Sequence, residues 1–357
     1  MKANELMHYW SKTERHGLGK TLRQAALVLA LMLTLVCTQA MAQDTKSILM
    51  VLWRGETEVE TGFRAYMEER NHALRIETVS VDRDIGRIPE VLARIEEAKP
   101  DLVYTWGTPV TLAIAGRDPG AMNATDYPPQ ITDTPIVFAM VSQPENSGVV
   151  GSSLLTGRNV TGVSHIVPMV TQVQAMLAYM PVDRIATIFT ETEVNSVNAV
   201  NALRAVGEQL NLRVDAYPIP MDAAGQPMPS SLPDLIARAA SSGPQFLYLG
   251  PDSFLGQYAK EVTSLTNAIG LPTFASTERS LNSSDALYGL VAPYKDVGRL
   301  AAQKVEQVLF EDMDPGSIAV ETLPNFSYRI RLDVAQHLGA FPAMELMDYA
   351  EIVDGSN

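Results

Sequence analysis

Cysteine is almost absent from this sequence, with Cys37 alone among 357 residues. A single cysteine cannot form an intrachain disulfide or supply a cysteine-rich zinc site. Histidine is scarce as well, and the three that follow residue 42 (His72, His165 and His337) lack the spacing of metal ligands. We therefore expect neither a metal nor a cofactor in this protein.

Catalytic motifs are missing too. No nucleophile elbow (Gly-x-Ser-x-Gly), Walker loop or Gly-x-Gly-x-x-Gly turn follows a predicted strand. Acidic pairs such as Glu68-Glu69 lie on predicted helices whose opposite face is apolar, which is typical of a solvated surface. Because nothing nominates a nucleophile, the sequence predicts a binding protein rather than an enzyme.

The apolar run over residues 25–36 is well short of the roughly 20 residues that a membrane span needs. Basic residues precede it, and Ala40 and Ala42 place small side chains at −3 and −1 of a cleavage site. This pattern predicts a signal peptide over residues 1–42, cleaved after Ala42, and a periplasmic protein; a membrane anchor is the alternative. Cys37 follows Val36 rather than a small residue, so we expect it to leave with the signal instead of carrying a lipid.

Positive charge is in deficit, with 27 Lys and Arg against 41 Asp and Glu and a net charge of −14. Cleavage would remove five basic and two acidic residues and take the net charge from −14 to −17. Such a surface repels phosphate backbones and anionic lipid headgroups, so we expect no nucleic acid and no membrane as a partner.

What the sequence does contain is a repeat. Residues 88–94 (IPEVLAR) return as residues 232–238 (LPDLIAR), at an offset of 144. The same offset pairs residues 102–104 with 246–248, and Thr108 with Asp252. Each copy is typical of a helix, a proline break, a short apolar strand and a polar turn that opens another helix. Two similar α/β halves predict a protein with a cleft between them.

Strands and helices alternate along the chain. Strands are expected at 47–53, 75–81, 102–106, 135–141, 185–190, 213–219, 246–249 and 272–275, and helices at 61–69, 88–98, 109–115, 196–210, 232–240 and 256–268. This order predicts an α/β fold with right-handed βαβ units and parallel sheets. Such sheets bind ligands beyond the carboxyl ends of their strands, which directs attention to the loops there.

Two matched loops carry the candidate ligand contacts. Gly107 and Thr108 end one strand and open a helix, where free backbone amides can hold a carboxylate. Asp252 takes the equivalent place in the second half and could face an ammonium group. For both Thr108 and Asp252 a plain helix cap is the alternative. If Asp252 lies on the cleft rim, Asp252→Ala abolishes binding of an amine-bearing ligand and leaves the fold intact.

Other candidates lie in neighbouring loops. Asn195 and Ser196 follow the first strand of the second half, and either could instead cap a helix. Large rings near the expected mouth offer apolar area for a ligand, although each alone is more often core: Trp53, Trp106, Phe138 and Tyr294.

These pieces occur in an order that resembles a known family, the substrate-binding proteins of ABC transporters of the tryptophan/tyrosine type. The matching pieces are residues 62–63, 100–103, 107–109, 135–138, 159–164, 193–196, 252, 294–299 and 332–342. The resemblance implies a type I periplasmic-binding fold, with two Rossmann-like lobes joined by a hinge of three crossovers near 163–167, 291–294 and 323–326. The lobes would comprise 43–164 plus 292–324 and 165–291 plus 325–344, followed by an acidic tail over 345–357.

The same resemblance implies a function. It suggests capture of one small molecule, an amino acid or related zwitterion, and delivery to an ABC permease with its ATPase in the inner membrane. Polar contacts would come from Thr108, Asn195, Ser196 and Asp252, with Tyr294 near the hinge, and the protein would be a monomer. A ligand sensor for a membrane receptor and a two-lobed hydrolase or transferase are the alternatives. Arg54 departs from the family pattern and could bind a second acidic group.

Overall fold

The computed structural model describes residues 45–121, 124–151 and 154–353. The predicted signal peptide, its cleavage after Ala42 and Cys37 lie outside this part. From Lys46 onward the chain forms one compact unit. Within the described residues, every helix is too short or too polar to cross a bilayer.

The first sheet has five parallel strands in the order β2-β1-β3-β4-β5. They are β1 (Lys46–Leu52), β2 (Leu74–Ser80), β3 (Leu102–Trp106), β4 (Ile136–Val141) and β5 (Val160–Ser164). Strands β3, β4 and β5 are buried along their whole length. That is the signature of a parallel sheet covered by helices on both faces, and it explains why these strands are continuous apolar runs in the sequence.

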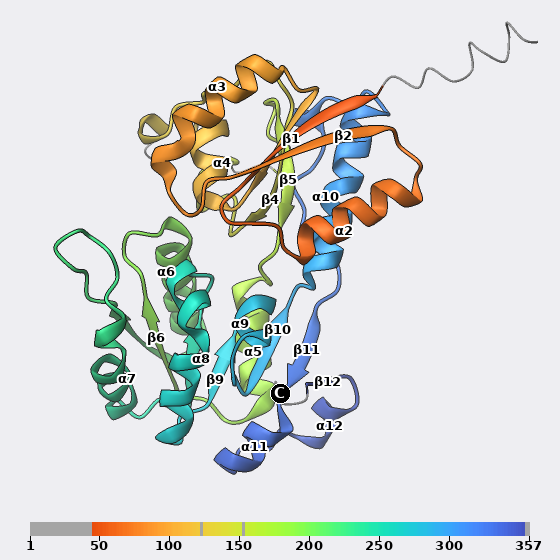
Figure 1. The fold of residues 1–357 in the computed structure, drawn as a ribbon. Helices are drawn as coiled ribbons and strands as arrows, with labels where there is room; N and C mark the ends of the chain where they lie inside the picture. Colours follow the sequence, from red (N-terminus) through yellow and green to blue (C-terminus); the bar gives the residue numbers. More distant parts are fainter. Residues whose placement is uncertain (1–44, 122–123, 152–153, 354–357) are drawn as a thin grey trace, which may run out of the picture. The chain divides into compact units, whose positions relative to one another are not determined.

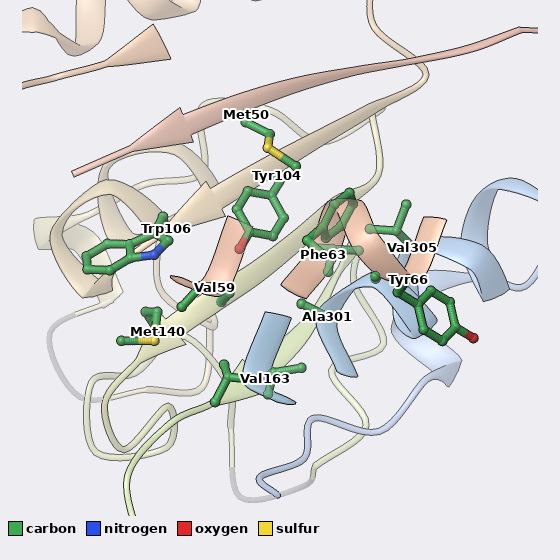
Figure 2. Close-up of a cluster of buried hydrophobic side chains, with 14 of the residues drawn as sticks. Met50, Val59, Phe63, Tyr66, Tyr104, Trp106, Met140, Val163, Ala301 and Val305 are labelled. Atoms are coloured by element: carbon green, nitrogen blue, oxygen red, sulfur yellow. The ribbon is translucent and has the colours of Figure 1, made fainter. Parts of the chain in front are cut away.

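Four helices pack on this sheet (Figure 1). They are α2 (Glu58–Glu69), α3 (Ile88–Ala98), α4 (Thr108–Ala115) and α10 (Tyr294–Leu309). Helices α2 and α10 cover one face, and Figure 2 shows the buried side chains of that layer around Phe63 and Tyr104. Glycines at Gly62 and Gly298 let the two helices touch, because a Cβ at either position would overlap a backbone carbonyl of the other helix.

The second sheet has seven strands in the order β12-β11-β10-β9-β8-β6-β7. They are β6 (Arg184–Phe189), β7 (Arg213–Pro218), β8 (Phe246–Leu249), β9 (Thr273–Ala275), β10 (Tyr288–Val291), β11 (Ser327–Ile330) and β12 (Glu351–Ile352). Its helices are α5 (Met169–Tyr179), α6 (Val194–Gln209), α7 (Leu232–Ser241), α8 (Ser253–Ala268), α9 (Glu278–Asn282), α11 (Leu332–Leu338) and α12 (Met344–Met347). β11 runs antiparallel to β10, so this sheet is mostly parallel, with one antiparallel pair near its edge.

We call each sheet with its helices a lobe, the five-stranded lobe and the seven-stranded lobe. The chain passes between them three times: after β5, between β10 and α10, and before β11. The predicted α/β fold with a three-crossover hinge is therefore confirmed. The predicted lobe ranges, 43–164 with 292–324 and 165–291 with 325–344, stay a proposal. The predicted tail is not separate, because β12 adds a strand beside β11.

The repeat is present in the structure as well. Helix α3, strand β3 and helix α4 have the same order as α7, β8 and α8, and each of the helices α3 and α7 has a proline in its first turn. Strand β5 and helix α5 are not among the elements that the sequence predicts.

Candidate functional site

A cavity of about 60 Å³, lined by both polar and apolar side chains, lies between the two lobes. Its walls come from loops at the carboxyl ends of strands: Trp53 after β1, Thr108 after β3, Asp252 after β8 and Thr277 after β9. This is the edge at which an open α/β sheet binds ligands. The cavity therefore joins the two matched loops that the repeat singled out.

Gly107 and Thr108 line the cavity at the start of α4. Gly107 has φ +90°, a backbone conformation that glycine adopts without strain, and it takes the N-cap position. Thr108 is the first helical residue, so the expectation that it caps its own helix is wrong. Its hydroxyl accepts a hydrogen bond from the amide of Ser142 at 3.1 Å. No described side chain caps α4. The Gly107 amide donates to the Ala139 carbonyl and Pro109 has no N–H, so an anion at this end would use the amides of Thr108 and Val110.

Asp252 lines the opposite wall and is only 8% exposed. It caps α8, since Oδ1 accepts from the amide of Leu255 at 2.9 Å. Its Oδ2 accepts from the Ser196 hydroxyl at 2.6 Å and from the Thr190 amide at 2.8 Å. Asp252 is therefore a helix cap, as the alternative interpretation has it. Its carboxylate also binds Ser196 and Thr190, and it lines the cavity.

Two further residues at the start of α6 complete this wall. Asn195 lines the cavity; its amide donates to the Pro251 carbonyl at 2.7 Å, while its buried Oδ1 has no partner among the described residues. Ser196 does not line the cavity; its hydroxyl donates a hydrogen bond to Asp252, which does. Glu193, which was not a candidate, accepts from the amide of Ser253 at 2.9 Å. Burial and the nearby Asp252 raise the pKa of Glu193 to about 7.

The predicted aromatic contacts divide into two groups. Trp53, Trp106 and Tyr294 line the cavity. Phe138 does not: it is fully buried in the core of the five-stranded lobe, where it packs against Gly162. It points away because β4 alternates faces, and a β-bulge between Ala139 and Val141 brings Met140 to the cavity wall instead.

Three charged or titratable residues at the cavity were not among the predicted site residues. They are Arg54 after β1, His165 after β5 and Arg279 in α9. Arg54 stood out in the sequence as unusual, but the other two gave no motif. His165 is 5% exposed, and burial together with Arg54 lowers its pKa to about 3, so it is neutral at physiological pH.

Direct hydrogen bonds join the two lobes beside the cavity. The indole Nε1 of Trp53 donates to the Ser253 hydroxyl at 3.2 Å. Arg83 Nη1 donates to Gln257 Oε1, also at 3.2 Å. A second cavity of about 420 Å³ adjoins the first and shares Trp53, Thr108, Pro109 and Ser253 with it. The lobes therefore contact each other over the small cavity in this structure.

The described residues contain no group of three or more His, Cys, Asp or Glu side chains that could hold a metal ion. The polar groups around the cavity are single side chains and helix termini, an arrangement suited to a small organic molecule.

Comparisons with known proteins agree with this geometry. A family model described as an ABC transporter substrate binding protein matches residues 60–353. A tyrosine-binding protein of Clostridioides difficile (strain R20291) is 26% identical over 286 residues, which cover 79% of this chain and 76% of that protein.

Solved structures show the same fold. An ABC domain from Streptococcus pneumonia in complex with L-Trp superposes with a TM-score of 0.69 at 20% identity, covering 86% of this chain and 99% of that one. A conserved domain protein from Vibrio cholerae O1 biovar El Tor gives a TM-score of 0.72 at 16% identity, covering 87% and 100%.

Proposed function

Because the chain belongs to the ABC transporter substrate-binding protein family, we propose that it captures one small molecule between its two lobes and delivers it to an ABC permease in the inner membrane. The observation that carries this proposal is the cavity itself, which both lobes line and which contains polar atoms without partners among the described residues. Buried polar atoms are normally hydrogen-bonded, so their concentration at one cavity is an argument for a ligand.

The ligand that we propose is an amino acid or a close analogue. The amides of Thr108 and Val110 at the start of α4, next to Gly107, would hold its carboxylate. Asp252, on the opposite wall, would face its ammonium group. The relatives support this class, since one is named a tyrosine-binding protein and another was solved with L-Trp.

Binding would proceed by closure of the lobes about the three crossovers. The hydrogen bonds Trp53–Ser253 and Arg83–Gln257 link the lobes, so they would exist only in the closed form. A ligand shifts this equilibrium by its differential affinity for the two forms. In this proposal the protein is exported to the periplasm, acts as a monomer and performs no catalysis.

Native mass spectrometry of protein purified from cells tests the proposal. We expect a single small molecule bound one to one, and a smaller radius of gyration by small-angle X-ray scattering when ligand is added to stripped protein. Trp53→Phe, which keeps the ring and removes the bond to Ser253, should weaken binding. Turnover of candidate esters or amides, or failure of every amino acid and related small acid to bind, would refute the proposed function.

A further inference from the structure

The cavity carries an excess of positive charge. Arg54 and Arg279 both line it, and they come from different lobes. Burial, together with repulsion from Arg279 and Arg83, lowers the pKa of Arg54 to about 10. Arg54 is therefore still cationic at neutral pH.

No described carboxylate forms an ion pair with Arg54. Its guanidinium lies over the Trp106 ring at 4.7 Å from the centroid, and its buried Nε has no hydrogen-bond partner among the described residues. Arg279 donates from Nε to the Gly256 carbonyl at 3.3 Å, which leaves its charge uncompensated. Both side chains are partly buried, and a charge that loses water without gaining a counter-ion is costly.

The carboxylates nearby are already engaged. Glu278 pairs with Arg329 at 3.0 Å and accepts from the amide of Tyr294 at 2.6 Å. Asp252 accepts three hydrogen bonds from its own wall, as described above. The protein therefore offers the two arginines no free anion at the cavity.

Further donors lie in the same place. The indole Nε1 of Trp106 and the ring Nδ1 of His165 are buried at the cavity and have no hydrogen-bond partner among the described residues. The Arg54 Nε is a third atom of this kind. The Trp106 and Arg54 nitrogens carry hydrogens, and Nδ1 of the neutral His165 ring carries one in one of its two tautomers, so these atoms together suit an acceptor-rich group such as a carboxylate.

We propose that the ligand carries an acidic group in addition to its α-carboxylate, and that Arg54 and Arg279 hold this group between the lobes. The inference rests on the proposed function and narrows its ligand class to acidic amino acids and similar small dicarboxylates. A neutral zwitterion adds no net charge, so it would leave the two guanidiniums opposed only by Asp252. A ligand with one extra negative charge balances them.

This arrangement also makes closure depend on the ligand's charge. Two cations that approach each other from opposite lobes repel when nothing lies between them. An anion between them attracts both, which gives it a greater affinity for the closed form than for the open one. A neutral amino acid has no net charge to attract both arginines, so it does not gain this extra affinity for the closed form.

Isothermal titration calorimetry with isosteric pairs tests the inference on protein stripped of ligand by unfolding and refolding. The pairs are L-glutamate with L-glutamine and L-aspartate with L-asparagine; glutarate, succinate and L-tyrosine complete the panel. We expect the better acid to bind at least about tenfold more tightly than its amide. Arg54→Gln and Arg279→Gln should each remove most of that preference, whereas Arg75→Gln, an exposed site on β2, should leave it unchanged.

Arg54→Lys provides a variant that keeps the charge, and it should retain part of the preference even if Arg54→Gln fails to fold. If neutral amino acids bind one to one as tightly as acids, the inference is wrong while the proposed function stands. If only the dicarboxylates without an amino group bind, the acidic subsite stands and the zwitterion in the proposed function is wrong. If nothing in the panel binds, the proposed function and this inference fail together.

Discussion

Replacement of Asp252 separates the structural role of this carboxylate from its proposed role in binding. Judged from the sequence alone, Asp252→Ala leaves the fold intact. The structure changes that expectation, because Asp252 is 8% exposed and accepts hydrogen bonds from Leu255, Thr190 and Ser196. Their lengths, 2.9, 2.8 and 2.6 Å, are those of good hydrogen bonds to a charged group.

The cost of Asp252→Ala can be worked from these contacts. Loss of the cap on α8 costs about 1 kcal/mol. The Thr190 amide keeps a second acceptor in the Ser196 hydroxyl at 3.2 Å, so it is not orphaned. The weakened bonds of these two buried groups add about 1–2 kcal/mol. We therefore expect the free energy of unfolding to fall by about 2–3 kcal/mol, the sum of these two contributions.

Urea unfolding measures this change, and Asp252→Asn is the matched control. Asparagine is a good N-cap and keeps one acceptor, so it should cost only about 1 kcal/mol. Both variants should lose affinity for an amine-bearing ligand, since both lose the charge. An alanine variant within about 0.5 kcal/mol of wild type, the range of ordinary surface substitutions, would refute the assigned contacts.

Two further predictions concern the pH dependence of stability and the packing of helices. Burial and Asp252 raise the pKa of Glu193 from its ordinary 4.5 to about 7. Between these two pH values the folded protein keeps a proton that the unfolded chain releases. The free energy of unfolding therefore falls as pH rises from about 4.5 to 7. Glu193→Gln should remove that part of the slope in urea midpoints measured between pH 5 and 8; an identical profile would show that Glu193 has an ordinary pKa. Gly298→Ala places a Cβ against the Val59 carbonyl and should destabilise the protein by about 1–3 kcal/mol, while Gly55→Ala, with open space around it, should change the free energy of unfolding by less than about 0.5 kcal/mol. Equal effects of the two glycine substitutions on the urea midpoint would contradict the close contact of α2 and α10.

Most of the α/β order could be predicted because its signals are local. Strand β3 and helix α3 were predicted with their observed bounds. A short apolar run is a local signal for a buried strand, and an amphipathic segment that begins with proline is a local signal for a helix. Helix α5 was missed for the opposite reason: six of its eleven residues are buried, among them Gln172, so it lacks the regular polar face on which the prediction of helices depends. The antiparallel pairing of β11 depends on how the chain returns from the hinge, which no local pattern encodes.

The cavity was only partly predictable. Thr108 and Asp252 were found through the repeat offset, but two of the three hydrogen bonds that Asp252 accepts come from residues 56 and 62 positions away, beyond the reach of a local pattern. Arg279 had a usable signal, because it lies just after the loop that follows β9, one of the predicted ligand loops. A survey of charged residues in all of these loops would have paired it with Arg54.

The two copies of the repeat differ at the helix starts that line the cavity, so the two walls of the cavity differ in charge. In the first copy no described side chain caps α4, so its N-terminal amides remain available to an anion. In the second copy Asp252 occupies the equivalent position and neutralises the start of α8 by accepting from Leu255. One wall is therefore a partial positive pole and the other carries a carboxylate, although both descend from the same helix–strand–helix pattern. In the proposed function, a ligand with a carboxylate at one end and an ammonium at the other would therefore bind in one orientation. In the further inference, its second acidic group would lie toward Arg54 and Arg279.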